Sequence, residues 1–295
     1  MDIAKHRYFM MQVLLAIFRD KELSVQFAFK GGTSLMLFHQ LPRFSTDLDF
    51  NLLDDTKAES VFRALHNLLL RFGKIDDEAM KFYGPLLVLN YGGGNRMLKV
   101  EVSSRHYDNH YEIKTLAGTD VRVMTLPDMF AHKLCALGER ITPRDIFDVW
   151  FFLQKGTAIN PNIVRLRTGM GVAGYASQCA ESIRKTSPKV LMQGIGELIG
   201  DEKQKNFVKS HLIEETASNL ELFALSPIIS DQTMTERMRL LTDYPAISEM
   251  MLANDVDLSI VSERQLRLLI EEHSTLVFPT RSGNKVSLSL AQHEL

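Results

Sequence analysis

The feature that most constrains this chain is a strand of alternating polarity that follows a pair of glycines. Residues 46–53 read TDLDFNLL, so apolar residues alternate with aspartate and asparagine. Successive side chains of a β-strand point to opposite faces, which places Asp47 and Asp49 on one polar face. Two carboxylates at this spacing repel each other unless a cation or water lies between them, and a rigid pair suits a hard ion such as Mg²⁺. A solvated strand face is the alternative interpretation.

The glycines, Gly31 and Gly32, lie between an expected strand over 25–30 and an expected helix that ends before Pro42. Glycine lets backbone N–H groups approach an anion closely, at the positive end of a helix dipole. Thr33 and Ser34 add hydroxyl donors in the first turn of this helix. The segment is therefore expected to bind phosphate, and a plain strand-to-helix turn with a hydroxyl cap is the alternative.

A third acidic residue is expected on another strand. In LKVEVSSR, residues 98–105, Lys99, Glu101 and Ser103 share one face. If this strand neighbours the first, Glu101 supplies a third carboxylate. Three carboxylates can hold two Mg²⁺ ions roughly 3.5–4 Å apart, an arrangement that activates an attacking hydroxyl and stabilises a leaving pyrophosphate. A surface strand with an ordinary Lys–Glu pair is the alternative.

Composition restricts the class of protein. The chain has 295 residues, of which 45% are hydrophobic and 24% charged, as expected for a soluble globular protein of two domains or one large unit. The net charge of −2 gives no general attraction to nucleic acid, so any such contact must come from local patches. Cys135 and Cys179 fit no zinc or redox spacing, which favours a reducing cytosol. No apolar run reaches the length of a membrane span.

The expected fold class is α+β. Residues 1–125 are predicted to form a mixed sheet with flanking helices, and residues 126–295 a mostly helical domain. In the first part we expect a helix over 5–18, a helix over 56–72, a hairpin that turns at 92–95, and a strand over 120–126. The polar tail, 282–295, is expected to be loose.

Taken together, these segments resemble a known family. KGGTSL and RFSTDLDF, then KVEVSSR, then HKLCAL and PRDIFDV are similar to the AbiEii/AbiGii abortive-infection toxins, which are nucleotidyltransferase-like proteins of the DNA polymerase β superfamily. The resemblance covers about residues 25–155. It implies that Asp47 and Asp49 bind metal with Glu101 as the third acid, and that Gly31 and Gly32 form the phosphate loop. Residues 156–295 contain no segment that we can match.

The segment HKLCAL belongs to an expected helix over 126–140. Lys133 and Arg140 fall within its apolar arc, and cations on such a face need an anion or a route to solvent. A nucleotide triphosphate between the two domains is one such anion, and pairing with a core carboxylate is the alternative. Asp145 occupies the position of a helix-capping acid after Thr142, so we expect a structural role, with a supporting salt bridge to these cations as the functional option.

The resemblance implies an Mg²⁺- or Mn²⁺-dependent nucleotidyltransferase, the toxin of a bacterial toxin–antitoxin pair. It implies transfer of a nucleotide from an NTP to RNA, such as a tRNA 3′ end, and a cognate antitoxin in the cytoplasm. Asp47, Asp49 and Glu101 would hold the metal, and Lys133 and Arg140 would neutralise the triphosphate. Two alternatives stay open: a nucleotidyltransferase that modifies antibiotics or proteins, and a non-catalytic nucleotide-binding module.

Overall fold

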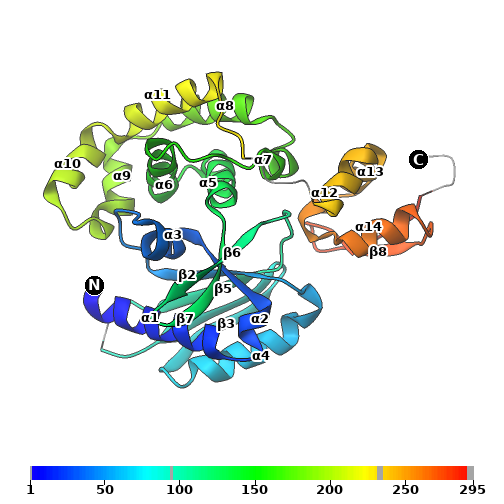
Figure 1. The fold of residues 1–295 in the computed structure, drawn as a ribbon, viewed down its shortest axis with the longest axis horizontal. Coiled ribbons are helices and arrows are strands. Elements are labelled where there is room, and N and C mark those ends of the chain that lie inside the picture. Colours follow the sequence, from blue (N-terminus) through cyan, green and yellow to red (C-terminus); the bar gives the residue numbers. More distant parts are fainter. Residues whose placement is uncertain (1, 94–95, 231–234, 291–295) are drawn as a thin grey trace.

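A computed structural model describes residues 2–93, 96–230 and 235–290 of the chain. A mixed β-sheet carries helices on both faces, and a smaller module at the C-terminal end lies to one side (Figure 1). The α+β class and the mostly helical second half are therefore confirmed.

The strands of the main sheet are β1 (Phe27–Lys30), β2 (Asp47–Leu52), β3 (Lys74–Lys81), β4 (Gly84–Asn90), β5 (Leu98–Ser103), β6 (Tyr111–Leu116) and β7 (Thr119–Met124). Their order across the sheet is β3-β4-β5-β2-β1-β7-β6. Strand β2 runs parallel to β5 and antiparallel to β1, and β1 runs parallel to β7. The two strands that carry the predicted acidic residues are therefore neighbours at the centre of the sheet.

One face of this sheet is covered by N-terminal helices. These are α1 (Ile3–Arg19), α2 (Leu23–Gln26) and α4 (Ala58–Leu69), with the 3-10 turn η1 (Asp55–Lys57) before α4 (Figure 1). The alternation predicted for β2 is observed, because Leu48 and Phe50 are fully buried. Phe50 stacks on Phe27 with ring centroids 5.1 Å apart. This packing anchors β2 from behind and leaves its polar face toward the opposite side.

The other face of the sheet is turned toward α3 (Gly31–His39) and a helical region (Figure 1). The helices of this region are α5 (Leu126–Arg140), α6 (Pro143–Gln154), α7 (Pro161–Thr168), α8 (Val172–Ile183), α9 (Pro188–Ile195), η2 (Gly196–Leu198), α10 (Glu202–Ser210) and α11 (Leu212–Leu225). Their buried residues and those of the sheet form one continuous hydrophobic cluster. The division at residues 125 and 126 stays a prediction, since this cluster extends across it.

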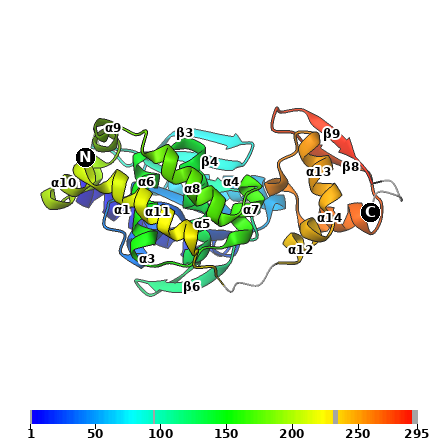
Figure 2. The same ribbon diagram turned by 90° about the horizontal axis from the view of Figure 1, so that it is seen from above.

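A second hydrophobic cluster forms the C-terminal module, which we define as residues 235–290. It contains α12 (Glu236–Asp243), α13 (Pro245–Ala253), η3 (Leu258–Ile260), α14 (Glu263–Ile270) and the hairpin β8 (Leu276–Pro279) and β9 (Lys285–Leu288). Seen from above, the module lies at one end of the molecule (Figure 2).

The structure differs from the sequence predictions where the local pattern is weak. Strand β3, KIDDEAMK, is polar on both faces because it lies at the edge of the sheet, and its sequence gives little alternation. Strand β6 is the opposite edge and was missed for the same reason. The tail predicted to be loose contains β9, which pairs with β8, and only residues 291–295 lie outside the described chain. Residues 94 and 95 of the predicted hairpin turn also lie outside it.

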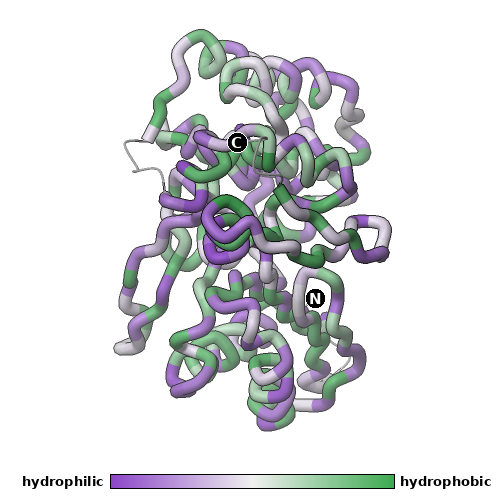
Figure 3. Tube along the Cα trace, turned by 90° about the vertical axis from the view of Figure 1, so that its right-hand side faces the viewer, coloured by the Kyte–Doolittle hydropathy of each residue, from purple (hydrophilic) through white to green (hydrophobic). Residues whose placement is uncertain are grey.

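Along the helices, hydrophobic and hydrophilic residues alternate (Figure 3). This is the pattern of amphipathic helices that cover a core. Within residues 2–93, 96–230 and 235–290, none of the helices combines the length and the apolar character that a membrane crossing requires.

Candidate active site

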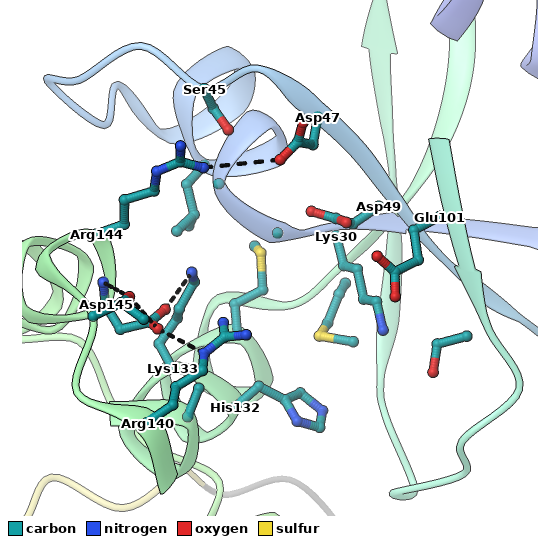
Figure 4. Close-up of a pocket in the computed structure, with 18 of the residues that line it drawn as sticks. Lys30, Ser45, Asp47, Asp49, Glu101, His132, Lys133, Arg140, Arg144 and Asp145 are labelled. Carbon is teal, nitrogen blue, oxygen red and sulfur yellow. Dashed lines mark hydrogen bonds and ion pairs between the residues drawn. The ribbon is translucent and has the colours of Figure 1, made fainter. Parts of the chain in front are cut away.

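The three predicted acidic residues lie on one face of the sheet. Asp49 on β2 is the register partner of Glu101 on β5, and Asp47 is the register partner of Lys99. All four side chains line one cavity between the sheet and the helical region, with a volume of about 640 Å³. The carboxyl groups of Asp47, Asp49 and Glu101 appear in sequence along its upper and right-hand wall (Figure 4).

The diglycine forms the first turn of α3 and contacts the acidic residues closely. Gly31 has a φ of +80°, and a Cβ there would lie 2.6 Å from Asp49 Oδ2. At Gly32 a Cβ would lie 2.8 Å from Arg43 Nη2 and 2.9 Å from Ser45 Oγ. Both glycines line the cavity. The absence of side chains is therefore required by close approach, and it leaves the helix start facing the cavity.

The two hydroxyl residues after the glycines do not line this cavity. Thr33 Oγ1 donates to the main-chain oxygen of Asp47 over 2.5 Å, which ties α3 to the start of β2. Ser34 is buried, and its hydroxyl has no hydrogen-bond partner among the described residues. The hydroxyl of Thr33 thus positions the strand that carries the acidic pair.

The pKa values of Asp49 and Glu101 are shifted in opposite directions. Burial, together with the negative charge of Asp47, raises the pKa of Asp49. Burial would also raise the pKa of Glu101, but an ion pair with Lys99 outweighs this and lowers it. The Lys99 Nζ lies 2.7 Å from Glu101 Oε2. The site therefore holds one carboxylate whose charge is poorly compensated and one that is matched by a lysine.

The side-chain oxygens of Asp47, Asp49 and Glu101 are the groups that could bind a divalent ion at this site. Carboxylate oxygens are the ligands that Mg²⁺ and Mn²⁺ prefer, and a cation would reduce the repulsion by which Asp47 raises the pKa of Asp49. Among the described residues, no group of three or more His, Cys, Asp or Glu side chains is close enough to hold a metal ion. The donor chemistry therefore fits through the Asp47–Asp49 pair, and Glu101 joins only if Lys99 releases it.

Lys133 and Arg140, predicted to face a triphosphate, pair with carboxylates of the next helix. Lys133 Nζ lies 3.0 Å from Asp145 Oδ1 and 2.7 Å from Asp148 Oδ2, and Arg140 Nε lies 3.0 Å from Asp145 Oδ2. Burial alone would lower the pKa of Lys133, but Asp148 and Asp145 outweigh it and raise the pKa. Thr142 caps α6, because its Oγ1 accepts from the backbone N–H of Asp145 over 3.2 Å and donates to Asp145 Oδ2 over 2.6 Å.

The network continues to Arg43, which makes a bidentate pair with Asp148. Its Nε and Nη2 lie 2.7 Å from the two carboxylate oxygens, and both side chains are almost wholly buried, 2% and 0% exposed. This pair joins the segment before β2 to α6, so it connects the acidic pair to the helical region.

The cavity wall as a whole is positively charged. Its lining includes five acidic residues, Asp47, Asp49, Glu101, Glu139 and Asp145. It includes eight lysines and arginines, Lys30, Arg43, Lys99, Arg105, Lys133, Arg140, Arg144 and Arg167. Arg144 Nη1 lies 3.8 Å from Asp47 Oδ2. A cavity with this balance attracts anionic ligands, despite the negative net charge of the chain.

Several of these cations were not predicted. Lys30 and Arg43 are the first residues of KGGTSL and RFSTDLDF, and Arg105 is the last residue of KVEVSSR, whereas Arg167 lies in a segment without a recognisable motif. His132, next to Lys133 on α5, also lines the cavity. For Arg144 the signal was present, because it directly precedes Asp145 in PRDIFDV.

A sheet whose central strands present an acidic pair beside a diglycine helix start is the arrangement expected of a nucleotidyltransferase. Comparison with protein families supports this class. The family described as "Nucleotidyl transferase AbiEii toxin, Type IV TA system" matches residues 12–221, and the chain belongs to this family. It is a nucleotidyltransferase of a toxin–antitoxin system, as the resemblance implied.

Solved structures give weaker similarities. A Helicobacter pylori protein aligns over 75% of this chain and 92% of its own, with 19% identity and a TM-score of 0.47. JHP933 from Helicobacter pylori aligns over 85% and 97%, with 19% identity and a TM-score of 0.43. MenT4, a nucleotidyltransferase toxin from Mycobacterium tuberculosis, aligns over 75% and 91%, with 20% identity and a TM-score of 0.43. No curated protein matches the sequence.

Proposed function

We propose that this protein transfers a nucleotide from an NTP to a hydroxyl of RNA, such as a tRNA 3′ end, with Mg²⁺ or Mn²⁺ bound. The observation that carries the proposal is the shared face of Asp47, Asp49 and Glu101 beside the diglycine, at a positively charged cavity. The sheet domain, residues 1–125, supplies the wall with the three acidic residues, and residues between Met129 and Gly194 of the helical part supply the opposite wall.

Asp47 and Asp49 would hold the metal, with Glu101 as third ligand. When bound, the ion supplies positive charge that polarises a phosphoryl oxygen and lowers the pKa of a hydroxyl. The residues of the chain do the positioning. Backbone N–H groups at Gly31 and Gly32, at the start of α3, suit the phosphates of the NTP. Thr33 ties this turn to β2 through its hydrogen bond to the main-chain oxygen of Asp47.

On the opposite wall, Arg144 Nη1 lies 3.8 Å from Asp47 Oδ2, and Arg144 is proposed to meet the triphosphate beside the acidic pair. Lys133 and Arg140 are proposed to neutralise it as well, while Asp145 holds both cations in place through its ion pairs. Glu101, once it is free of Lys99, would accept the proton of the attacking hydroxyl.

The positive charge of the cavity lining favours a nucleic-acid acceptor over an aminoglycoside. Aminoglycosides are polycations and need an acidic pocket, whereas this wall has eight basic residues against five acidic ones. A phosphodiester backbone is attracted by the same wall. We further propose that the toxin acts in the cytoplasm and is neutralised by a cognate antitoxin, as the family description implies.

The test is incubation of the purified protein with each labelled NTP, Mg²⁺ and total cellular RNA. We expect labelled RNA with the wild type and none with Asp49→Asn, while the exposed control Asp77→Asn on β3 labels as the wild type does. Equal labelling by wild type and Asp49→Asn contradicts the proposal. Label on protein would indicate a protein-modifying enzyme. Growth arrest by Asp47→Ala without labelling would indicate a non-catalytic module.

A further inference from the structure

Three cations of the cavity wall have no role in the chemistry proposed above. Lys30, at the end of β1, donates from Nζ to the neutral amide oxygen of Asn51 over 2.5 Å. The guanidinium of Arg105 lies 3.6 Å above the ring of Tyr83. Its Nε is buried and has no hydrogen-bond partner among the described residues. In the described part of the chain, neither cation forms an ion pair.

The third cation is Arg167 on α7. Its Nη1 donates to Nδ1 of His132 over 3.0 Å, and its Nη2 lies 2.6 Å from Oε1 of Glu139. Since an arginine cannot accept a hydrogen bond, His132 carries its proton on Nε2 and donates it to Asn109 Oδ1 over 2.6 Å. His132 is therefore neutral. Within the described residues, the one acid that forms an ion pair with any of the three cations is Glu139, which is 48% exposed.

The three cations and His132 line the same cavity. Burial lowers the pKa of His132, and the positive charges of Arg167, Lys30 and Arg105 lower it further. Burial is also the main reason that the pKa of Lys30 falls to about 8. The negative charge of Asp49, the register partner of Lys30 on β2, opposes this fall, and the positive charge of Arg167 adds to it. Partly buried cations whose ion pair is with a half-exposed acid leave positive charge that an anionic ligand can neutralise. The cluster is therefore built to receive negative charge from a ligand.

Its position relative to the acidic pair indicates which ligand. Arg144, Arg140 and Lys133 lie to one side of the cavity, Lys30 and Glu101 to the other, and Asp47 and Asp49 lie along the top between them (Figure 4). In phosphoryl transfer the attacking and leaving oxygens lie roughly in line on opposite sides of the reacting phosphorus. If the diglycine and Arg144 take the leaving pyrophosphate, the cluster around Lys30 faces the attacking acceptor.

We propose that Lys30, Arg105 and Arg167 form an acceptor-side subsite that binds a phosphodiester of the RNA next to its reacting hydroxyl. The inference rests on the proposed function, because it assumes an RNA acceptor. His132 and Asn109 position Arg167 within the subsite, and Asn51 positions Lys30. Arginine suits this task, since its planar fork matches two phosphate oxygens.

The first experiment measures binding without catalysis. A fluorescent single-stranded RNA with a free 3′ hydroxyl is titrated with wild type, Arg167→Gln and Arg105→Gln, and a non-hydrolysable NTP is titrated separately by calorimetry. Each substitution should weaken RNA binding about tenfold and lower the slope of log K against log salt by about one, with NTP affinity unchanged within about twofold. Arg165→Gln is the matched control, because Arg165 is exposed on the same helix and does not line the cavity.

A second arm removes the charge from the ligand and leaves the protein unaltered. RNA with one neutral methylphosphonate linkage next to the 3′ end should bind wild type about tenfold more weakly but bind Arg167→Gln as the ordinary RNA does. If Arg167→Gln and the methylphosphonate each weaken binding and their effects add when combined, Arg167 does not bind that phosphodiester and the proposed subsite is wrong. A loss of NTP affinity without a loss of RNA affinity assigns the cluster to the triphosphate and also overturns it.

The outcomes separate the subsite from the proposed function. If wild type labels RNA and the variants bind RNA as wild type does, the subsite fails and the proposed function stands. If wild type neither binds nor labels RNA, both fail. Melting temperatures of the variants accompany each titration, so that a loss of binding is compared only among folded proteins.

Discussion

Lys99 and Glu101 lie two residues apart on β5 and share one face, with Lys99 Nζ and Glu101 Oε2 2.7 Å apart. The same ammonium also interacts with the charges of Asp49 and Asp47, which help to raise its pKa against the effect of burial. Lys99 is thus the counterion that the protein itself provides for its acidic face. A divalent ion at this face must compete with it.

The first prediction follows from this competition. Lys99→Gln should bind Mn²⁺ about two- to fivefold more tightly than wild type, because a partly exposed ion pair contributes up to about 1 kcal/mol. Calorimetry or Mn²⁺ electron paramagnetic resonance in the absence of NTP measures this affinity. Lys74→Gln on β3 is the control, since the Lys74 side chain is 82% exposed and pairs with Asp76, away from the acidic face. Weaker Mn²⁺ binding by Lys99→Gln would show that the lysine assists the metal.

The second prediction concerns the buried charge of Asp49. Burial raises its pKa, so the folded state holds the proton more tightly than the unfolded state. Stability is therefore lost as pH rises from the ordinary range of aspartate through the raised value, and the cost is fully present above that value. Asn at this position removes that cost. Metal-free Asp49→Asn should gain about 1 kcal/mol in unfolding free energy at pH 7.

Urea denaturation at several pH values measures this gain. The advantage of Asp49→Asn over wild type should grow as pH rises and vanish in acid, where wild type is protonated as well. Asp77→Asn, exposed on β3, should show no such trend. A variant less stable than wild type at neutral pH would contradict the electrostatic account.

A third prediction tests the buried pair of Arg43 and Asp148. Removing one partner leaves a buried charge without compensation, so Asp148→Ala should cost about 3–5 kcal/mol in unfolding free energy. Burial would raise the pKa of Asp148, but Arg43 and Lys133 lower it. The contribution of this carboxylate is therefore present above the ordinary aspartate range and is lost as pH falls through the lowered value.

Chemical denaturation at neutral pH measures the loss. Asp243→Ala, which replaces an exposed aspartate at the end of α12, should change stability by less than about 0.5 kcal/mol. Similar unfolding free energies for Asp148→Ala and Asp243→Ala would mean that the pair of Arg43 and Asp148 makes no net contribution to stability.

The fourth prediction separates backbone strain from crowding at the diglycine. Gly31 and Gly169 both have positive φ, +80° and +70°. Alanine should cost about 1–2 kcal/mol at either position. Only at Gly31 does the new Cβ meet a functional group, Asp49 Oδ2 at 2.6 Å, whereas Gly169 has open space. Gly31→Ala should therefore lose RNA labelling while Gly169→Ala keeps it. Full labelling by Gly31→Ala would show that Asp49 can shift without consequence.

The fifth prediction concerns how the C-terminal module is attached. Arg237 of the module lies 2.6 Å from Asp108 Oδ2, with both side chains under 10% exposed, and also donates to the main-chain oxygen of Val261. Arg237→Met should lower the local stability of the module by about 3–5 kcal/mol. Hydrogen exchange of β8 and β9 measures this. Arg239→Met, on the same helix but 56% exposed, is the control. Unchanged exchange would show that hydrophobic packing alone holds the module.

Much of the sheet domain was predictable because its signals are local. The alternation in β2 and the glycines before α3 depend on the period of a strand and on the allowed φ of one residue, which are properties of neighbouring positions. The shared face of Lys99 and Glu101 has the same origin. Edge strands β3 and β6 were not predicted, because a strand that is exposed on both faces needs no alternation of polar and apolar residues.

What the sequence by itself determined is the set of chemical groups and their local direction: two aspartates on one strand face, a third acid on another, and a helix that begins with glycine. The tertiary structure decided which of these groups meet. Register between β2 and β5 places Asp49 beside Glu101, and helix packing directs Lys133 to Asp145 and Asp148. Folding also brings Lys30, Arg105 and Arg167 together from distant segments. Such pairings depend on the packing of the whole core and leave no periodic signal, because each is the product of contacts between residues far apart in the chain.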